Sequence, residues 1–286
     1  MSISGFTIVR NATVLDFPIE ASIRSVLPAV DEFVVNIGMS EDDTLERVRA
    51  IGDPRIRIIE STWDRSLGPA MLAHETDRAR AECTHPWGIY IQADEVLQDG
   101  GAALMAEAIA RHDGDERIEG LVVTYHHFYG GFDSTATNRS WYRRETRAIR
   151  LRHPHQVHSF RDAQGFRVGA DDRRIRCAPS GAVMHHYGWA RPAWALAAKR
   201  REDLEIYPWR RAQDAERPLL PWIPGIRRFR GTHPAGVADW IAERAHGERL
   251  VAPFRWETHH LNLAVSGFVE QFTGWRPFEY RNYEMV

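Results

Sequence analysis

Strand and helix signals alternate regularly over the first 125 residues, and this alternation limits the fold more than any other feature of the sequence. Short apolar runs predict strands at Phe6–Val9, Phe33–Ile37, Ile56–Ile59, Gly88–Ile91 and Leu121–Tyr125. Helical spacing of apolar residues predicts helices between them, near 19–30, 44–51, 69–82 and 102–111. Strands and helices of this length form right-handed βαβ units. We therefore expect an α/β protein with a mostly parallel central sheet flanked by helices.

The composition is typical of a folded protein without a global charge. The chain has 286 residues, 43% of them apolar, and 37 basic against 39 acidic side chains give a net charge of −2. No overall field therefore attracts nucleic acid or anionic lipid. Two cysteines, Cys83 and Cys177, are too few for a disulfide framework. With neither a signal-peptide pattern nor an apolar run of about 20 residues, we expect a cytoplasmic protein.

The pattern becomes less regular after about residue 125. Strands are expected at Trp141–Arg152 and Ala182–Tyr187, and the residues beyond 200 look helical and irregular. We expect a domain at 1–200 with a C-terminal extension at 201–286 packed on it. Between residues 200 and 230, tryptophans are interleaved with eight Arg and five acidic residues. This mixture is typical of aromatic core anchors with solvated arginines, and it would also suit an acceptor sugar, a lipid diphosphate or peripheral contact with a membrane.

Polar residues follow three of the predicted N-terminal strands. They are Arg10 and Asn11, the segment 36–43, and the segment Gln92–Glu95. Ligands of parallel α/β sheets bind at the carboxyl ends of strands, so a site is expected there. The chain has neither a GxGxxG nucleotide fingerprint nor a P-loop lysine. The acidic pair Asp94-Glu95 would suit a divalent ion that also binds diphosphate oxygens, or it is an ordinary turn in solvent.

In this order, the motifs resemble those of the family 2 nucleotide-sugar glycosyltransferases, which have the GT-A fold. The opening strand with Arg10-Asn11 is similar to the family's first strand, and residues 36–44 resemble its Asp-Asp-Gly-Ser-x-Asp-x-Thr segment. Residues 89–95 resemble its Leu-Asp-x-Asp-Asp motif. His186-Tyr187-Gly188-Trp189, followed by Arg191, Pro192 and Lys199, is similar to an element of a bacterial subgroup.

The resemblance implies roles for individual residues. Asn36 and the loop with Ser40 and Asp42 would face the nucleobase and ribose. Asp94 and His186 would bind Mn²⁺ or Mg²⁺, although Gln92 stands where the family usually has its first motif aspartate. The residues expected to bind the nucleotide sugar are Arg10, Asn11, Asn36, Ser40, Asp42, Gln92, Asp94 and Glu95.

An inverting transfer also needs a carboxylate that deprotonates the acceptor hydroxyl. By its position relative to the family, the segment 158–165 matches the region of this base, and Asp162 is the first candidate. Asp133, in Gly130-Gly131-Phe132-Asp133, is the second. Either aspartate would equally serve to cap a turn.

The 14 histidines raise the alternative of a metallohydrolase. They include the pairs 126–127, 185–186 and 259–260 and the segment His153-Pro154-His155-Gln156-Val157-His158. Neighbouring histidines on a strand point to opposite faces, so each pair gives at most one ligand to an ion. We interpret the segment 153–158 as a polar loop.

The sequence therefore leaves three functions open. The first is transfer of a sugar from a nucleotide-diphosphate donor to a hydroxyl acceptor, with inversion, in bacterial surface glycan synthesis. The second is metal-dependent hydrolysis of a sugar nucleotide or diphosphate at the same site. The third is binding of a sugar nucleotide without catalysis, since Gln92 and Asn36 replace residues that are charged in the family.

Overall fold

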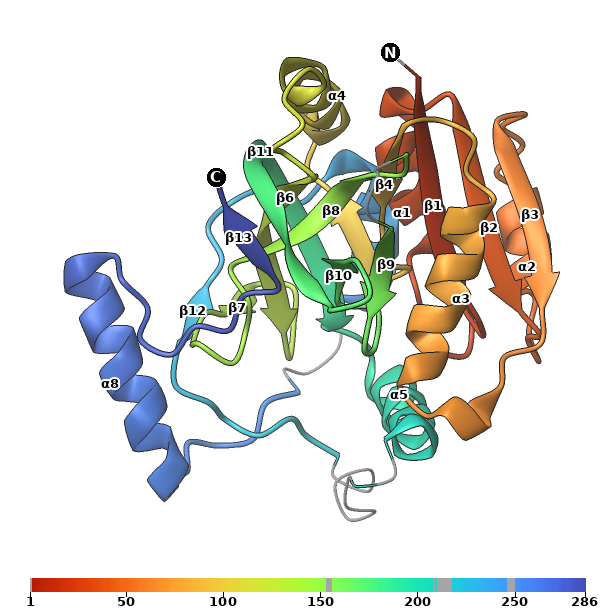
Figure 1. The fold of residues 1–286 in the computed structure, drawn as a ribbon. Coiled ribbons are helices and arrows are strands. Elements are labelled where there is room, and N and C mark those ends of the chain that lie inside the picture. Colours follow the sequence, from red (N-terminus) through yellow and green to blue (C-terminus); the bar gives the residue numbers. More distant parts are fainter. Residues whose placement is uncertain (1, 153–155, 208, 210–217, 246–249) are drawn as a thin grey trace.

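The computed structural model describes residues 2–152, 156–207, 209, 218–245 and 250–286. His153 and His155 of the histidine-rich segment lie outside the described residues, as do Arg210, Arg211 and Arg217 of the Trp- and Arg-rich segment. Helices cover both faces of a large central sheet (Figure 1). The α/β class predicted from the sequence is confirmed.

The N-terminal part of the sheet is parallel, as predicted. Its strands are β1 (Ile3–Val9), β2 (Glu32–Gly38), β3 (Ile56–Ser61) and β4 (Trp87–Tyr90), in the order β3-β2-β1-β4. All seven residues of β1 are buried, because helices cover this central strand on both sides. The helices between the strands are α1 (Ile19–Val26), η1 (Leu27–Ala29), α2 (Thr44–Arg49), η2 (Arg65–Leu67) and α3 (Ala70–Ala81).

Beyond β4 the sheet becomes mixed. The main path continues through β8, β6, β11, β10 and β9, and β8 pairs antiparallel with both β4 and β6. Short connections in place of helical crossovers explain this change, since a parallel pair needs a long connection. The strands are β5 (Glu95–Leu97), β6 (Gly120–Tyr129), β7 (Ser134–Ala136), β8 (Arg144–Arg150), β9 (Val157–Phe160), β10 (Gly165–Val168) and β11 (Arg173–Trp189), and helix α4 is Gly101–His112.

Two apolar layers hold the sheet. On one face, Ile23 of α1 and Met105 of α4 pack with Phe33 and Trp87 of the sheet. On the other face, α3 covers a layer that includes Phe6, Tyr90 and Phe166. Phe6 and Tyr90 lie 5.3 Å apart between ring centroids, directly behind the carboxyl ends of β1 and β4. These layers fix the positions of the strand ends that carry the candidate site.

The C-terminal residues return to the sheet. Helix α5 (Ala193–Ile206) spans residue 200, so the expected boundary between 1–200 and 201–286 falls inside a helix. The last strand, β13 (Tyr283–Met285), pairs in parallel with β11. Between them lie β12 (Ile226–Arg228), η3 (Ala235–Val237), α7 (Ala238–Arg244) and α8 (Thr258–Thr273). None of the helices in the described ranges combines the length and the apolar character that crossing a membrane requires.

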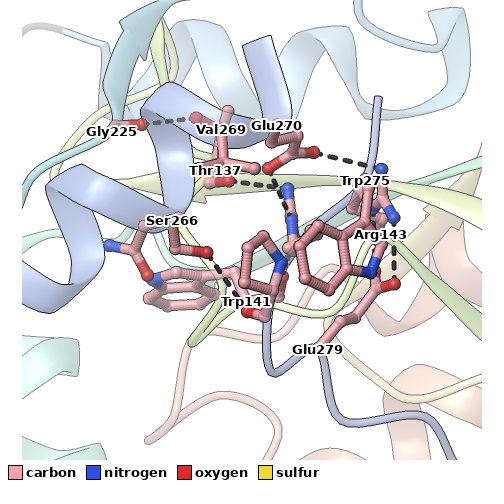
Figure 2. A network of polar contacts seen from close by, with 12 residues as sticks. Thr137, Trp141, Arg143, Gly225, Ser266, Val269, Glu270, Trp275 and Glu279 are labelled. Carbon is pink, nitrogen blue, oxygen red and sulfur yellow. Dashed lines mark hydrogen bonds and ion pairs between the residues drawn. The ribbon is translucent and has the colours of Figure 1, made fainter. Parts of the chain in front are cut away.

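Helix α8 is attached through its polar side. Figure 2 shows Glu270 between two arginines: Arg143 donates to it at 3.1 Å and Arg276 at 2.7 Å. Arg143 also pairs with Glu279, and the Ser266 hydroxyl donates to the carbonyl of Pro277. The opposite side carries an exposed stripe at helical spacing, formed by Leu261, Val265, Phe268 and Phe272. The helix therefore turns its polar side to the body of the molecule and its apolar side outward.

Candidate active site at the carboxyl ends of β1 and β4

A cavity of about 280 Å³ lies where polar residues were expected to converge, at the carboxyl ends of β1 and β4. Arg10 follows β1, and Gln92 and Asp94 follow β4. The opposite wall is formed by the β9–β10 turn with Asp162 and by α5 with Lys199. The cavity thus joins the parallel half of the sheet to segments more than 60 residues further along the chain.

Asp94 is surrounded by positively charged or ionisable groups. Its Oδ2 atom accepts a hydrogen bond from Arg191 at 2.8 Å, with His186 Nε2 at 3.7 Å and Lys199 Nζ at 3.9 Å. Burial alone would raise the pKa of Asp94, but His186, Lys199 and Arg191 together hold it well below its ordinary value. Asp94 is therefore an ionised carboxylate at the wall of the cavity.

Arg191 holds the Asp94 carboxylate in place from outside the cavity. Its guanidinium lies over the ring of Phe17, 4.5 Å from the centroid, and donates to the carbonyl of Leu15. Arg191 does not line the cavity, whereas Lys199 and Arg10 do. Arg10 is itself oriented by Glu202, which accepts from it at 2.8 Å. The cavity wall therefore presents two basic side chains, Lys199 and Arg10, among the carboxylates of Asp94, Asp162, Glu202 and Asp203.

His186 is oriented by a second histidine. The Nδ1 atoms of His186 and His127 are 3.0 Å apart, and His127 Nε2 lies 2.7 Å from the carbonyl of Tyr142. Burial, followed by the nearby His186, lowers the pKa of His127 well below its ordinary value, so this ring is neutral. A carbonyl only accepts, so His127 carries its proton on Nε2 and accepts at Nδ1 from His186. With Nδ1 bound to His127, His186 turns its Nε2 atom towards Asp94.

This donor set fits a divalent ion. A carboxylate oxygen and an imidazole nitrogen with a free lone pair are ordinary ligands of Mn²⁺, and the hydrogen bond to His127 resembles the outer-shell support of metal-bound histidines. Within the described ranges, no third His, Cys, Asp or Glu joins them to complete a metal cluster. A metal held by Asp94 and His186 would therefore keep positions open for ligand oxygens.

Gln92 and Glu95 have different placements. Gln92 lines the cavity and donates from Nε2 to the carbonyl of Ala163 at 3.2 Å. Glu95 faces the core instead, where Arg147 donates to both of its oxygens at 2.7 and 2.9 Å and the Tyr125 hydroxyl donates at 2.7 Å. The side chains of Glu95 and Arg147 have no exposed surface. Glu95 therefore stabilises the turn after β4 rather than reaching the cavity, unlike the expected contact with the nucleotide sugar.

Asn36 is also directed into the core. Its amide donates to the Glu75 carboxylate at 2.8 Å, and its oxygen accepts from the Ser61 hydroxyl at 2.6 Å. The residue is fully buried and does not line the cavity. Asn36 therefore links β2, β3 and α3, and the structure does not bring it together with Asp94 and His186 as expected.

Asn11, Ser40 and Asp42 shape the strand-end loops. Asn11, in the left-handed region with φ 53°, accepts from the backbone N–H of Glu41 at 2.9 Å. Ser40 accepts from the Asn11 backbone N–H, and Asp42 accepts from the backbone N–H of Thr13 at 2.8 Å. These contacts bind the two loops to each other. None of the three residues lines the cavity, in contrast to Arg10 beside them.

The structure separates the two candidates for the base. Asp162 lines the cavity, and the Tyr207 hydroxyl donates to its Oδ2 at 3.1 Å. Its neighbours Arg161 and Ala163 both have positive φ, 57° and 60°, so the turn that carries Asp162 is strained. Asp133 is exposed in the β6–β7 connection and does not line the cavity. Asp162, and not Asp133, is thus brought to the cavity of Asp94.

Sequence reasoning gave no role to several residues of the site. Lys199, Glu202, Asp203 and Ile206 line the cavity from one face of α5, at spacings of three and four residues. The sequence shows this helical spacing, but the segment after residue 200 was expected to be partly irregular, so the four residues were not assigned to one face of a helix. The contact between His127 and His186 joins two strands that are 59 positions apart, and no local pattern encodes it.

The chain is similar to several proteins of known structure. No family model matches the chain, and no curated protein does. One similar structure is glucosyl-3-phosphoglycerate synthase from Mycobacterium tuberculosis in complex with Mn²⁺, UDP and phosphoglyceric acid: TM-score 0.32, 22% identity, 45% of this chain and 43% of that chain. Another is S. aureus TarS: TM-score 0.42, 11% identity, 76% of this chain and 42% of that chain. The chain thus spans less than half the length of these proteins.

Proposed function

We propose that the chain is a nucleotide-sugar glycosyltransferase of the GT-A type that transfers a sugar to a hydroxyl acceptor. The observation that carries the proposal is the ionised Asp94. It lies beside His186 and Lys199 in the wall of a cavity at the carboxyl ends of parallel strands. The motif resemblance predicted a donor site at this position. Residue by residue, Asp94 and His186 are the positions at which that resemblance expects a metal.

Two basic side chains of the cavity would act on a diphosphate leaving group. When the bond between the sugar carbon C1 and the phosphate oxygen breaks, negative charge develops on the diphosphate, and fixed cations stabilise it. Lys199 and Arg10 line the cavity and would supply this stabilisation. A divalent ion, Mn²⁺ or Mg²⁺, would be held by Asp94 and His186 Nε2 and would add positive charge beside the diphosphate.

Asp162 is the proposed general base. It would accept the proton of the acceptor hydroxyl while the acceptor oxygen forms the new bond to C1, with inversion at that carbon. The hydrogen bond from the Tyr207 hydroxyl orients the carboxylate and leaves its other oxygen for the acceptor. The proton thus moves from the acceptor to Asp162, and the electron pair of the broken bond leaves with the diphosphate.

Finer assignments belong to the same proposal. The acceptor would be part of a bacterial surface glycan, and the C-terminal extension would face the acceptor or make peripheral contact with a membrane. We propose that the donor-binding part ends at about residue 207 rather than at 200, a boundary supported by the cavity that Lys199 and Tyr207 both line.

Calorimetry with UDP, GDP and dTDP sugars, with and without Mn²⁺, followed by assay of released nucleoside diphosphate, tests the proposal. Binding, and release that depends on an acceptor, are expected. Asp94→Asn should abolish turnover, and Asp162→Asn should stop transfer while donor affinity is retained. Asp133→Asn is the matched control and should behave like the unsubstituted protein. Circular dichroism checks that each variant is folded.

Each other outcome identifies an alternative. Release without an acceptor would indicate a hydrolase, and binding without turnover would indicate a non-catalytic binder. Failure of every nucleotide sugar to bind would reject the donor site itself.

A further inference from the structure

A second hollow adjoins the donor cavity. It has a volume of about 430 Å³ and shares Asp162, Gln164 and Tyr207 with the first cavity. Its remaining wall comes from the start of α3, the end of β9, Trp209 and the C-terminal segment before β13. The two hollows therefore meet at Asp162, the proposed general base.

The turn that carries Asp162 holds this residue between the two spaces. Arg161 and Ala163 flank it in the left-handed region, a strained conformation for non-glycine residues that persists where surrounding structure enforces it. An acceptor must bring its hydroxyl to Asp162 without occupying the donor cavity. The second hollow is the space beside Asp162 that satisfies this requirement.

The walls of the second hollow suit a carbohydrate ring. Phe160, Tyr207, Trp209 and Tyr280 place four aromatic rings around it, and Trp209 is 70% exposed. The C–H faces of a pyranose pack on such rings, while its hydroxyls need polar partners. Gln164 and Asn282 are uncharged polar residues of its wall.

Arg161 lines the hollow and gives it a positive charge, whereas the buried Arg167 lies behind its aromatic wall and does not line it. The Arg161 guanidinium lies 5.0 Å from the centroid of Phe160 and 6.0 Å from that of Tyr280. Arg167 is 5% exposed, lies 4.3 Å from the Phe160 ring centroid, and donates to Tyr280 Oη and to backbone carbonyls. Among the residues that the structure describes, no carboxylate pairs with either arginine. The charged residues that line the hollow are therefore one carboxylate, Asp162, and one cation, Arg161.

We propose that the second hollow is the acceptor subsite and that it takes a sugar bearing an acidic group. This inference rests on the proposed function, since it uses Asp162 as the base of a transfer reaction. The aromatic rings position the sugar, Arg161 attracts its acidic group, and Asp162 receives the proton of its reactive hydroxyl.

Saturation-transfer NMR on the full chain tests this subsite with methyl glycosides of glucose, galactose, glucuronic acid and galacturonic acid. The acidic glycosides are expected to bind at least tenfold more tightly than the neutral ones. Trp209→Ala should weaken this binding at least tenfold, and Arg161→Ala should remove the preference for the acidic glycosides. Trp275→Ala is the matched control, because Trp275 is also exposed and lines neither hollow.

Nucleotide binding separates failure of this inference from failure of the proposed function. Trp209→Ala should leave the affinity for nucleoside diphosphates unchanged. If nucleotides bind but no glycoside does, or if Trp209→Ala has no effect on glycosides, the acceptor subsite is rejected and the donor site stands. Equal binding of neutral and acidic glycosides would overturn the role of Arg161. If no nucleotide binds, the proposed function itself fails.

Discussion

Asp94 and Glu95 are adjacent in the sequence, but their carboxylates lie in different environments and have different roles. Asp94 faces the cavity with His186 and Lys199, whereas Glu95 opens β5 and is held in the core by Arg147. Asp94 belongs to the turn after β4, whereas Glu95 is the first residue of β5, so the backbone directs the two side chains into different environments. Only the first of them is therefore available to a ligand.

Glu95→Gln should damage stability rather than a ligand contact. The substitution leaves the Arg147 charge buried without a carboxylate, and such losses cost about 3–5 kcal/mol of the free energy of unfolding. Urea unfolding measures this change. Asp115→Asn is the control, because the pair of Asp115 with Arg117 lies at the surface, and its loss should change stability little. Equal stability of Glu95→Gln and the unsubstituted protein would contradict the structural role of Glu95.

Lys199→Ala is expected to weaken binding of a nucleoside diphosphate about tenfold or more. A hydrogen bond assisted by a charge contributes about 1.5–3 kcal/mol, and Lys199 lines the cavity beside Asp94. Calorimetry with UDP, GDP or dTDP measures the loss, which should be smaller at high salt. Arg201→Ala, at an exposed position of the same helix, should leave the affinity unchanged. An unchanged affinity of Lys199→Ala would remove this residue from the donor site.

At the scale of elements, α8 inverts the usual relation between polarity and burial. Amphipathic helices normally turn their apolar stripe to the core. In α8 the stripe from Leu261 to Phe272 is exposed, and the buried side is held by Glu270 and its two arginines (Figure 2). Hydrophobic periodicity alone would predict the opposite orientation of this helix.

The two sides of α8 should therefore respond differently to substitution. Glu270→Gln is expected to lower the free energy of unfolding by about 2 kcal/mol, because it weakens hydrogen bonds to Arg143 and Arg276. Phe268→Ser, on the exposed stripe, should change it by no more than about 0.5 kcal/mol. Urea unfolding of both variants measures this contrast. A larger loss for Phe268→Ser than for Glu270→Gln would contradict the orientation of the helix.

At the scale of the whole molecule, neutral histidines link stability to pH. Burial, followed by the nearby His126 and His233, lowers the pKa of His185 to about 3, and burial also lowers the pKa of His126 and of His233. These rings are neutral in the folded chain and take up protons when it unfolds. Their contribution is therefore complete above about pH 6.5 and is lost as the pH falls towards 3.

The free energy of unfolding should accordingly fall between pH 7 and pH 5. The slope approaches about 1 kcal/mol per pH unit for each histidine that stays neutral in the folded state. His185→Phe should reduce the slope, because phenylalanine cannot bind the proton and its ring suits the aromatic neighbours Phe128 and Tyr187. Urea unfolding at several pH values tests this prediction. An identical slope in both proteins would exclude His185 as a source.

The sequence predicted the fold where signals are local. The four parallel strands and their helices follow from apolar periodicity, whereas the antiparallel pairing of β8 depends on contacts between distant strands. The approach of His186 to Asp94 was expected only through the motif resemblance. The sequence did not predict that Asn36 and Glu95 lie in the core. Their buried partners, Glu75 and Arg147, are distant in the sequence, and no local pattern indicates such a pairing.

Lys199 offers a practical site for selective labelling. It is the only lysine among 286 residues, and its side chain lines the cavity beside Asp94. Apart from an α-amino group, amine-selective chemistry therefore has a single target in this protein. Reductive methylation with ¹³C-formaldehyde would introduce an NMR reporter at the cavity wall without any change to the sequence.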